Sequence, residues 1–237
     1  MDELLLGHIR MTIPARHFGV STDSMALADF CRIARGSRVL DLGCGCGLVS
    51  LLLLGSDPSL TVCGVELLPD AARQARENAA QNGLSAQFTV VCGDLREEHT
   101  AVAPGSFDCA VSNPPYYPPR SGFVCADAQL AAARSELHCS PDELCRAAAR
   151  ALRWGGRFFL VHKPERLADL ICALRGAQLE PKRMQLVQHR ASALPSLVLL
   201  EARRGGKPGL ACEPNLILYD ETGLPTAAYR RIYHLQE

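Results

Sequence analysis

Several kinds of residue are scarce in this 237-residue chain, and each scarcity excludes a class of protein. No apolar run approaches the ~20 residues that a membrane-spanning helix needs. The first residues, MDELLLGHIRM, carry two acids and only three consecutive leucines, so we expect no secretory signal and a cytoplasmic protein. The formal net charge is zero, which argues against a general nucleic-acid coat protein. The hydrophobic content of 48% is typical of a globular domain.

Cysteine pairs at metal-binding spacing are also missing. The chain has eleven cysteines, an odd number, and no two of them have the CxxC spacing. A zinc site needs ligands at fixed short spacing, and a disulfide framework belongs to small secreted chains. Cys63, Cys92 and Cys109 lie inside apolar runs, where a free thiol serves as a small buried hydrophobic group. We therefore predict no metal and no disulfide framework.

Lysine is scarce as well, because 22 of the 25 basic residues are arginine. Residues 1–149 contain 17 acidic and 11 basic residues, whereas residues 150–237 contain 8 and 14. Arginine is suited to bidentate contact with phosphate and to stacking on bases. This asymmetry fits a cofactor site beside a nucleic-acid-facing flank, and random scatter of surface charge fits it equally well. The candidate RNA contacts, each of which alone also fits a solvated surface position, are Arg183, Arg190, Arg203, Arg204, Lys207, Arg230 and Arg231.

Beyond residue 36, short β-rich apolar runs alternate with helical stretches. Such alternation is typical of βαβ units, so we predict an α/β fold with a mostly parallel sheet and helices on both faces. The helix at 141–154 is predicted to stop at Gly155 and Gly156. Two later strand-like runs have no helix between them and predict an antiparallel hairpin at the sheet edge. The predicted strands are 38–42, 61–66, 87–91, 107–112, 157–162, 183–189 and 197–203, and the other predicted helices are 48–54, 69–82 and 165–175.

A glycine-rich loop follows the first predicted strand in the stretch VLDLGCGCGLVS. Asp41, Gly43, Gly45 and Gly47 alternate where the strand turns into a helix. Glycines at such a turn let a ligand approach the backbone closely. The acid before this loop would repel a phosphate group, so the pattern DxGxGxG favours a cationic or amino-acid ligand.

Two more acids follow the next two predicted strands. Glu66 lies 25 residues after Asp41, near the offset of about 20 residues expected for an acid that binds ribose hydroxyls. Asp94 follows the third strand and is placed to accept a hydrogen bond from an adenine amino group. Each acid alone also fits a solvated loop position. Three acids after three successive strands predict a nucleoside-containing cofactor, because ligands of parallel sheets bind beyond the carboxyl ends of the strands.

The stretch SNPPYYPP follows the fourth predicted strand, and its prolines exclude a helix or a central strand there. The Asn113 side-chain oxygen and the Pro114 carbonyl can accept both N–H bonds of an amino group conjugated to a ring. Pro115 stiffens this acceptor pair, as preorganised catalysis requires, and Tyr116 can stack on a planar substrate. The alternative is a proline-rich turn in which Asn113 is only a turn residue.

The glycine loop and the acids resemble the class I S-adenosylmethionine-dependent methyltransferases. The resemblance implies a Rossmann-like seven-stranded sheet in the order 3-2-1-4-5-7-6, with strand 7 antiparallel. It also implies that the loop from Asp41 to Gly47, Cys44 included, holds the amino-acid end of S-adenosylmethionine. Glu66 with Leu67 would then bind the ribose, Asp94 with Leu95 the adenine, and Asn113 would border the cofactor. S-adenosylhomocysteine would be the product.

Further segments resemble the bacterial tRNA adenine-37 N6-methyltransferase family. They are FGVSTDSMALADF (18–30), ARSELHC (133–139), GGRFFLVHKPERL (155–167), EPKRMQLV (180–187) and ILYDETG (217–223). The resemblance implies methylation of an adenine N6 in tRNA or another structured RNA. We expect the enzyme to be a monomer. One departure is that Cys44 and Cys46 occupy loop positions often held by Ala, Thr or Ser; both are small enough for cofactor binding, and we expect the loop to be oxidisable.

The chain is interpreted as one domain with an N-terminal extension and a C-terminal tail, because it contains no internal repeat or convincing linker. Residues 1–35 would be an extension that folds over the cofactor site, with Thr22 and Asp23 near the cofactor. Residues 36–205 would be the methyltransferase domain, and residues 206–237 a tail packed on it. The insert from Tyr117 to Cys139 is long for a βα connection, where about 2–6 residues are usual. It is interpreted as a lid or RNA-contact loop, with Tyr117, Arg120 and Arg134 as substrate contacts, or as a local helix packed on the domain.

Three other functions fit part of the sequence. NPPY-type elbows also occur in enzymes that methylate the amide of glutamine in a release factor, but those carry a sizeable helical domain before the glycine loop, where this chain has about 37 residues. A guanine-N2 methyltransferase acting on rRNA is another alternative. A cofactor-binding RNA chaperone without turnover is disfavoured by the intact elbow.

Overall fold

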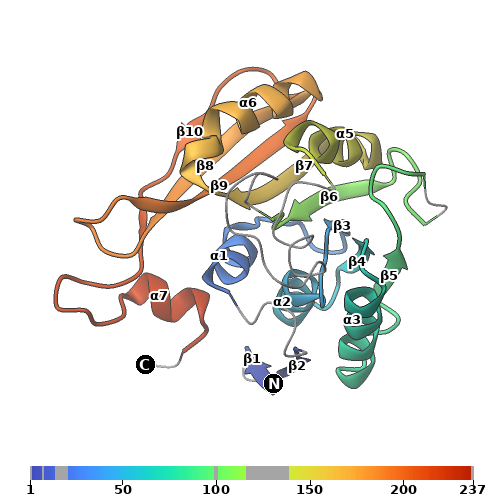
Figure 1. The fold of residues 1–237 in the computed structure, drawn as a ribbon, viewed down its shortest axis with the longest axis horizontal. Coiled ribbons are helices and arrows are strands. Elements are labelled where there is room, and N and C mark those ends of the chain that lie inside the picture. The colour runs from blue at the N-terminus through green and yellow to red at the C-terminus, as the bar shows by residue number, and fades with distance from the viewer. Residues whose placement is uncertain (1, 7, 14–20, 99–100, 116–138, 236–237) are drawn as a thin grey trace, which may run out of the picture.

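The computed structural model describes residues 2–6, 8–13, 21–98, 101–115 and 139–235. Over these ranges the chain forms a mixed sheet covered by helices on both faces, with α5 and α6 on one side and α1, α2 and α3 on the other (Figure 1). The sheet strands are β3 (Arg38–Leu42), β4 (Thr61–Glu66), β5 (Phe88–Cys92), β6 (Phe107–Ser112), β7 (Leu152–His162), β8 (Leu179–Gln188), β9 (Pro195–Arg204), β10 (Ala211–Cys212) and β11 (Leu216–Ile217). The helices are α1 (Thr22–Phe30), α2 (Leu48–Ser56), α3 (Pro69–Gln81), α5 (Pro141–Ala151), α6 (Leu167–Gly176) and α7 (Ala227–Ile232), with a 3-10 turn at Pro164–Arg166.

The strand order confirms the predicted topology. The order β5-β4-β3-β6-β7-β9-β8 corresponds to 3-2-1-4-5-7-6, and β9 is antiparallel to both of its neighbours. The strands from β5 to β7 pair in parallel. Because parallel strands share a direction, β3, β4, β5 and β6 present their carboxyl ends at one edge of the sheet. At this edge, called the carboxyl edge below, lie the glycine loop, Glu66, Asp94 and Asn113.

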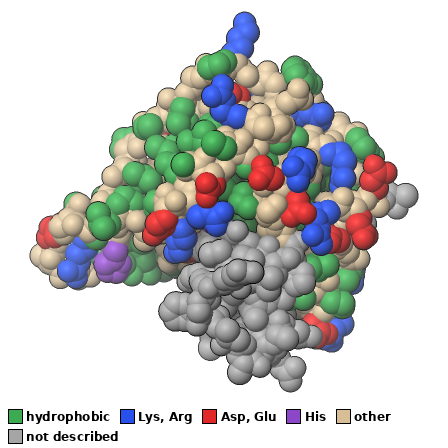
Figure 2. Space-filling model, turned by 45° about the horizontal axis from the view of Figure 1, so that its top comes forward, with side chains coloured by type: hydrophobic (Ala, Val, Ile, Leu, Met, Phe, Trp, Pro, Cys, Tyr) green, Lys and Arg blue, Asp and Glu red, His purple; other side chains and the backbone are tan. Residues whose placement is uncertain are grey.

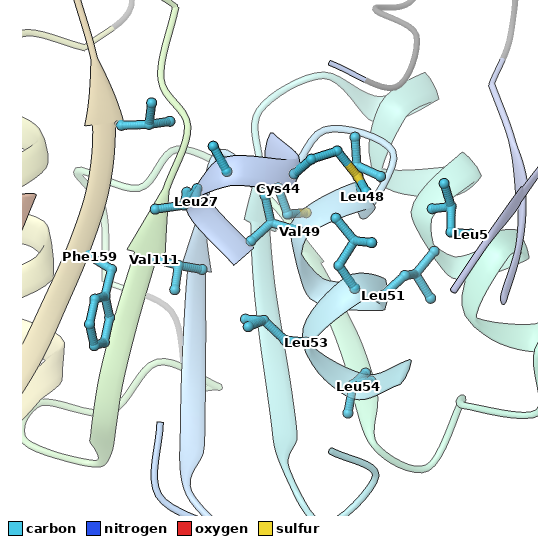
Figure 3. Close-up of a cluster of buried hydrophobic side chains, with 14 of the residues drawn as sticks. Leu5, Leu27, Cys44, Leu48, Val49, Leu51, Leu53, Leu54, Val111 and Phe159 are labelled. Atoms are coloured by element: carbon cyan, nitrogen blue, oxygen red, sulfur yellow. The ribbon is translucent and has the colours of Figure 1, made fainter. Parts of the chain in front are cut away.

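The two faces of the sheet bury two separate apolar clusters. On β7, Phe159 and Val161 pack into the cluster on the side of α1 to α3, while Phe158 and Leu160 pack into the cluster under α5 and α6. This alternation follows from the two-residue period of a strand. Figure 3 shows Leu27 of α1 in the first cluster, together with side chains of α2, β6 and β7. The N-terminal helix therefore shares its core with the elements that carry the glycine loop.

The predicted boundary between the helix at 141–154 and the strand at 157–162 is wrong. The helix expected to run to Trp154 ends at Ala151, and β7 begins at Leu152 rather than at residue 157. Leu152 already pairs with Phe107 of β6, and the register shifts between Phe107 and Cys109. The two glycines therefore lie within a strand that carries an irregular register, and they do not terminate the helix. α5 begins with a capping box, in which the Ser140 side chain accepts from the Glu143 N–H (3.3 Å) and the Glu143 carboxylate accepts from the Ser140 N–H (2.8 Å).

Six elements of the described residues have no counterpart among the predicted ones: strands β1 (Asp2–Leu5) and β2 (Ile9–Thr12), which form a hairpin, helix α1, the short strands β10 and β11, and helix α7. Both short strands pair in parallel with β8 and extend the sheet beyond the predicted seven strands. Strands of two residues leave too little periodicity to be recognised in a sequence.

Side-chain amides of α3 attach the β1–β2 hairpin to the domain. Asn78 accepts a hydrogen bond from the Thr12 N–H (3.0 Å) and donates to the Thr12 carbonyl (3.1 Å). Asn82 does the same for the N–H and carbonyl of Arg10, at 2.8 and 2.6 Å. Four helical residues rise about 6 Å and two strand residues about 7 Å, so the two spacings match. Asn78, which is fully buried, also donates to the Cys46 carbonyl of the glycine loop (2.9 Å).

Replacing Asn78 by alanine is therefore expected to lower the free energy of unfolding by about 3 kcal/mol, because the half-buried backbone groups of Thr12 and the buried carbonyl of Cys46 lose this partner. Urea denaturation followed by circular dichroism measures the loss. Arg73→Ala is the control, since Arg73 lies on the same helix with its side chain 66% exposed, where it pairs with Asp70 (3.0 Å). Equal losses in the two variants would contradict the assigned role of Asn78.

Candidate active site

The carboxyl edge brings together the glycine loop and three of the predicted acids. Asp41 lies in β3 opposite Gly64 of β4, and Glu66 ends β4 opposite Cys92 of β5. Asp94 lies two residues beyond β5, and Asn113 directly follows β6. Residues from four parts of the chain thus meet at one edge, as the alternation of strands and helices predicts.

The glycine loop has a backbone that other residues rarely adopt. Gly43, Gly45 and Gly47 have φ values of +74°, +55° and +90°, in the left-handed region that favours glycine. Of the described residues, none has a heavy atom within 4 Å of a Cβ atom built at Gly43 or Gly45, so both positions face open space within this part of the chain. A Cβ atom at Gly47 would lie 2.8 Å from the Phe88 ring, so glycine there also permits close packing of α2. The loop is therefore open on the side where a ligand can approach its backbone.

Glu66 ties the glycine loop to the second βα junction. Its carboxylate is buried and accepts hydrogen bonds from the N–H of Gly45 (2.8 Å) and of Leu68 (2.9 Å). The Glu66 carbonyl accepts from the Gly93 N–H (2.9 Å), which links β4 to the turn before Asp94. The neighbouring Leu67 is 38% exposed. Glu66 therefore offers acceptor oxygens at a fixed place, beside an apolar side chain.

Asp41 is buried beneath the glycine loop. The Ser50 hydroxyl of α2 donates to its carboxylate at 2.6 Å. Burial raises the pKa of Asp41 to about 7, the Ser50 hydrogen bond opposes this rise, and the nearby negative charge of Glu66 adds to it. The ionised form of Asp41 is thus destabilised in the folded chain, and a cationic group nearby would stabilise it.

This pKa predicts how stability depends on pH. A carboxyl group with a raised folded-state pKa binds more protons when folded than when unfolded, between its two pKa values. Its contribution to stability is present below pH 3.8 and is lost as the pH rises through about 7. We expect the Asp41→Asn variant to show a flatter fall in the free energy of unfolding across this window than the wild type. Urea denaturation at a series of pH values measures both slopes, and identical slopes would contradict the prediction.

Asp94 is paired with a neighbouring cation. Its carboxylate accepts hydrogen bonds from the Arg96 backbone N–H and from the Arg96 guanidinium Nε, both at 2.9 Å. Arg96 also lies 3.5 Å from Glu143 of α5. Leu95, which lies between Asp94 and Arg96 in the chain, is partly buried and packs against the cluster under α5 and α6. Arg96 therefore competes with the adenine contact that the sequence predicts for Asp94.

The residues after β6 form an irregular, half-buried segment. The Ser112 hydroxyl donates to the Leu42 carbonyl at the end of β3 (2.8 Å), which fixes the end of β6 beside the glycine loop. The Asn113 amide donates from Nδ2 to the Ser24 hydroxyl oxygen (2.9 Å). Pro114 and Pro115 follow with no regular secondary structure. Tyr116, Tyr117, Arg120 and Arg134 lie outside the described residues.

Thr22 and Asp23 form the first turn of α1, on the chain segment predicted to fold over the cofactor. The Thr22 hydroxyl lies 2.6 Å from the Tyr233 hydroxyl of the C-terminal tail. Tyr233 of the C-terminal tail therefore contacts the first turn of α1, at a residue two positions before Ser24 in the chain.

The two loop cysteines are buried. The Cys44 side chain lies against Gly64 of β4, where an added Cβ atom would come within 2.6 Å of its sulfur. Burial raises the pKa of Cys46 to about 11 and also raises the pKa of Cys44. Because the thiolate is the reactive form, the loop is less oxidisable than its sequence suggests. Among the described residues no group of three or more His, Cys, Asp or Glu side chains could hold a metal ion.

The structure places the candidate RNA contacts in different surroundings. Arg183 is buried; its guanidinium pairs with Glu201 at 2.8 Å and lies 3.7 Å from the centre of the Phe30 ring, so its prediction as an RNA contact is wrong. Arg203 and Arg204 end β9, which runs antiparallel to β7, and therefore lie at the edge opposite the site. On the face in Figure 2, basic and acidic side chains are interspersed beside a broad area of hydrophobic ones. The acidic first part and the basic second part of the sequence therefore do not produce a single basic surface on this face.

Three residues of this site were not predicted: Ser24, Ser50 and Asn78. Ser50 interrupts the apolar run LVSLLLL, and Asn78 lies among the buried alanines of α3. A polar residue on an otherwise apolar helix face is a sequence signal for a buried partner. Ser24 carries no comparable signal, because its neighbours Ser21, Thr22 and Asp23 are also polar.

The sheet order and the acids beside an open glycine loop define a class I methyltransferase, the class whose methyl donor is S-adenosylmethionine. The acidic side chains of the site fit this cofactor, because carboxylates accept hydrogen bonds from an ammonium group, from ribose hydroxyls and from an adenine amino group. No helix among the described residues is long and apolar enough to cross a membrane.

Comparison with known proteins identifies the family. The model of the methyltransferase small domain matches residues 19–171. The tRNA1(Val) (adenine(37)-N6)-methyltransferase of Dickeya chrysanthemi is 34% identical over 86% of this chain and 79% of its own length. The enzyme of the same name from Bacteroides fragilis is 32% identical over 76% of this chain and 75% of its own. The chain therefore belongs to the methyltransferase small domain family and to the tRNA1(Val) (adenine(37)-N6)-methyltransferases, which confirms the resemblance of the sequence.

A solved structure of similar fold is a predicted O-methyltransferase from Agrobacterium tumefaciens. It superposes with a TM-score of 0.74 at 21% identity and covers 90% of this chain and 96% of its own. This likeness supports the fold assignment.

Proposed function

We propose that the protein transfers a methyl group from S-adenosylmethionine to the exocyclic N6 of an adenine in tRNA. The observation that carries this proposal is the place of Asn113, Pro114 and Pro115 directly after β6, at the same edge as the glycine loop and with the Asn113 amide anchored. The names of the relatives, which specify adenine N6 and tRNA, support the choice of acceptor.

The cofactor contacts are assigned to the carboxyl ends of β3, β4 and β5. Asp41 and the open glycine loop would hold the amino-acid end, Glu66 with Leu67 the ribose, and Asp94 with Leu95 the adenine. S-adenosylmethionine supplies, when bound, an electrophilic methyl group on a sulfonium. Thr22 and Asp23 are proposed to close over this site, within an extension at residues 1–35 that precedes the domain at 36–205 and the tail at 206–237.

The acceptor contacts are assigned to the elbow. The Asn113 side-chain oxygen and the Pro114 carbonyl would accept the two N–H groups of the adenine amine and favour a tetrahedral nitrogen with its lone pair available. Pro115 would hold these acceptors rigid, which spares reorganisation during the reaction. Tyr116 would stack on an adenine extracted from its neighbours, with Tyr117, Arg120 and Arg134 as substrate contacts. We further propose that the enzyme is a cytoplasmic monomer.

The test is transfer of tritiated methyl from S-adenosylmethionine into total RNA and into total protein, followed by nucleoside and amino-acid analysis. The proposal requires label in N6-methyladenosine, and assays on individual purified tRNAs then identify the substrate. Label found only as methylglutamine would replace the proposal by modification of a protein, and label in N2-methylguanosine would replace it by the guanine alternative.

A further inference from the structure

The N-terminal helix contacts the elbow through one side chain. Ser24 of α1 is 6% exposed, and its hydroxyl oxygen accepts a hydrogen bond from Asn113 Nδ2 at 2.9 Å. The two residues are 89 positions apart in the chain. A buried hydroxyl on a different element is thus a hydrogen-bond partner of the amide to which the catalytic contact is assigned.

Ser24 is itself held in place from several directions. The Ser21 hydroxyl caps α1 by accepting from the Ser24 N–H and donates to the Ser24 hydroxyl oxygen, both at 3.3 Å. With the Asn113 amide, this fills the two acceptor positions of the Ser24 oxygen. At the other end of α1, the buried Arg183 donates to the Phe30 carbonyl (2.6 Å) and stacks on the Phe30 ring. Because both ends of α1 are fixed, the Ser24 oxygen is a rigid reference point for the amide.

The orientation of an asparagine amide decides what it can recognise. One arm of this planar group donates hydrogen bonds and the other accepts them. Donation from Nδ2 to Ser24 directs the acceptor arm, Oδ1, to the other side of the group. If the amide were reversed, its N–H bonds would meet the N–H bonds of an acceptor amine, and no hydrogen bond would form.

We propose that Ser24 is a positioning residue that orients the Asn113 amide so that its oxygen, and not its nitrogen, meets the amine to be methylated. This inference rests on the proposed function, in which Asn113 accepts hydrogen bonds from that amine. It assigns to the N-terminal helix a role in the chemical step, in addition to its packing in the core.

The first test separates turnover from binding. Ser24→Ala keeps a good helix former at this position but removes the oxygen, and we expect kcat to fall roughly 10-fold through loss of one buried hydrogen bond. KM for S-adenosylmethionine is expected to stay at the wild-type value. The matched control is Ser106→Ala, at the opposite end of β6, which removes a hydroxyl bonded to the Ala103 carbonyl (2.7 Å) and leaves kcat unchanged. Unchanged kcat in Ser24→Ala, or an equal fall in the control, would overturn the proposal.

The second test uses the symmetry of a carboxylate. Asn113→Asp places an oxygen on both arms, so orientation no longer matters, and adding Ser24→Ala is expected to cost far less there than in the wild type. Equal costs in both backgrounds would assign Ser24 a merely structural role.

A third measurement is independent of activity. The side-chain amide signals of Asn113 in a nitrogen-15 NMR spectrum, identified by their loss in Asn113→Asp, should shift in Ser24→Ala and stay in place in Ser106→Ala. If wild-type protein methylates another acceptor, the proposed function fails while these comparisons still decide the role of Ser24. Unshifted Asn113 signals in folded Ser24→Ala would overturn that role whatever the acceptor.

Discussion

Replacing Asn113 by alanine is expected to abolish methyl transfer while S-adenosylmethionine still binds. The variant removes the acceptor assigned to the amine, and removal of a preorganised group of this kind costs about 10² to 10³ in kcat. We expect a loss at the upper end of this range or beyond, because the Pro114 carbonyl alone cannot hold both N–H bonds. Single-turnover transfer to tRNA measures the chemical step, and calorimetry measures the dissociation constant of the cofactor.

The control for this experiment is Asn113→Asp, which retains acceptor oxygens at the same place and should keep part of the activity. The Asn113 side chain also contacts Ser24, so the folded state of each variant must be verified by its thermal unfolding. A folded Asn113→Ala protein that loses cofactor affinity as strongly as turnover would place Asn113 in the cofactor site alone.

Replacing Glu66 by alanine is expected to raise the dissociation constant of S-adenosylmethionine by roughly 100-fold or more, since hydrogen bonds to a charged group contribute about 1.5–3 kcal/mol each. Two causes act together. The ribose hydroxyls lose their proposed acceptor, and the N–H groups of Gly45 and Leu68 lose the carboxylate that fixes the loop. Calorimetric titration of the folded variant measures the change.

A pair of ligands separates these two causes. Wild-type protein should bind S-adenosylhomocysteine more tightly than its 2′-deoxy analogue, whereas Glu66→Ala should bind both equally weakly. Glu66→Gln is the matched variant, because it keeps one acceptor oxygen and should fall between the two. If Glu66→Ala still prefers the ribose ligand as strongly as wild type, Glu66 acts only through the loop.

Much of the fold follows from short-range patterns in the sequence. The bounds of β3, β4 and β6 agree with the apolar runs at 38–42, 61–66 and 107–112. The alternation of strands and helices placed the glycine loop, Glu66 and Asn113 at a shared edge, because every parallel strand of such a sheet ends on the same side. The sequence therefore predicts the part of the site that is made of residues at the ends of strands.

The contacts that hold this site lie between elements distant in the chain. The sequence by itself determined the alternating strands and helices of the α/β sheet, the glycine loop with its acids, and the elbow after β6, because strand periodicity, glycine spacing and proline stiffness are local properties. Only the tertiary structure decided that Ser24 meets Asn113, that Asn78 holds the Cys46 carbonyl, and that Arg183 is buried beneath α1 and not exposed to RNA. These partners are chosen by the packing of whole elements against a common core, and residue type and spacing alone do not specify which surfaces will meet.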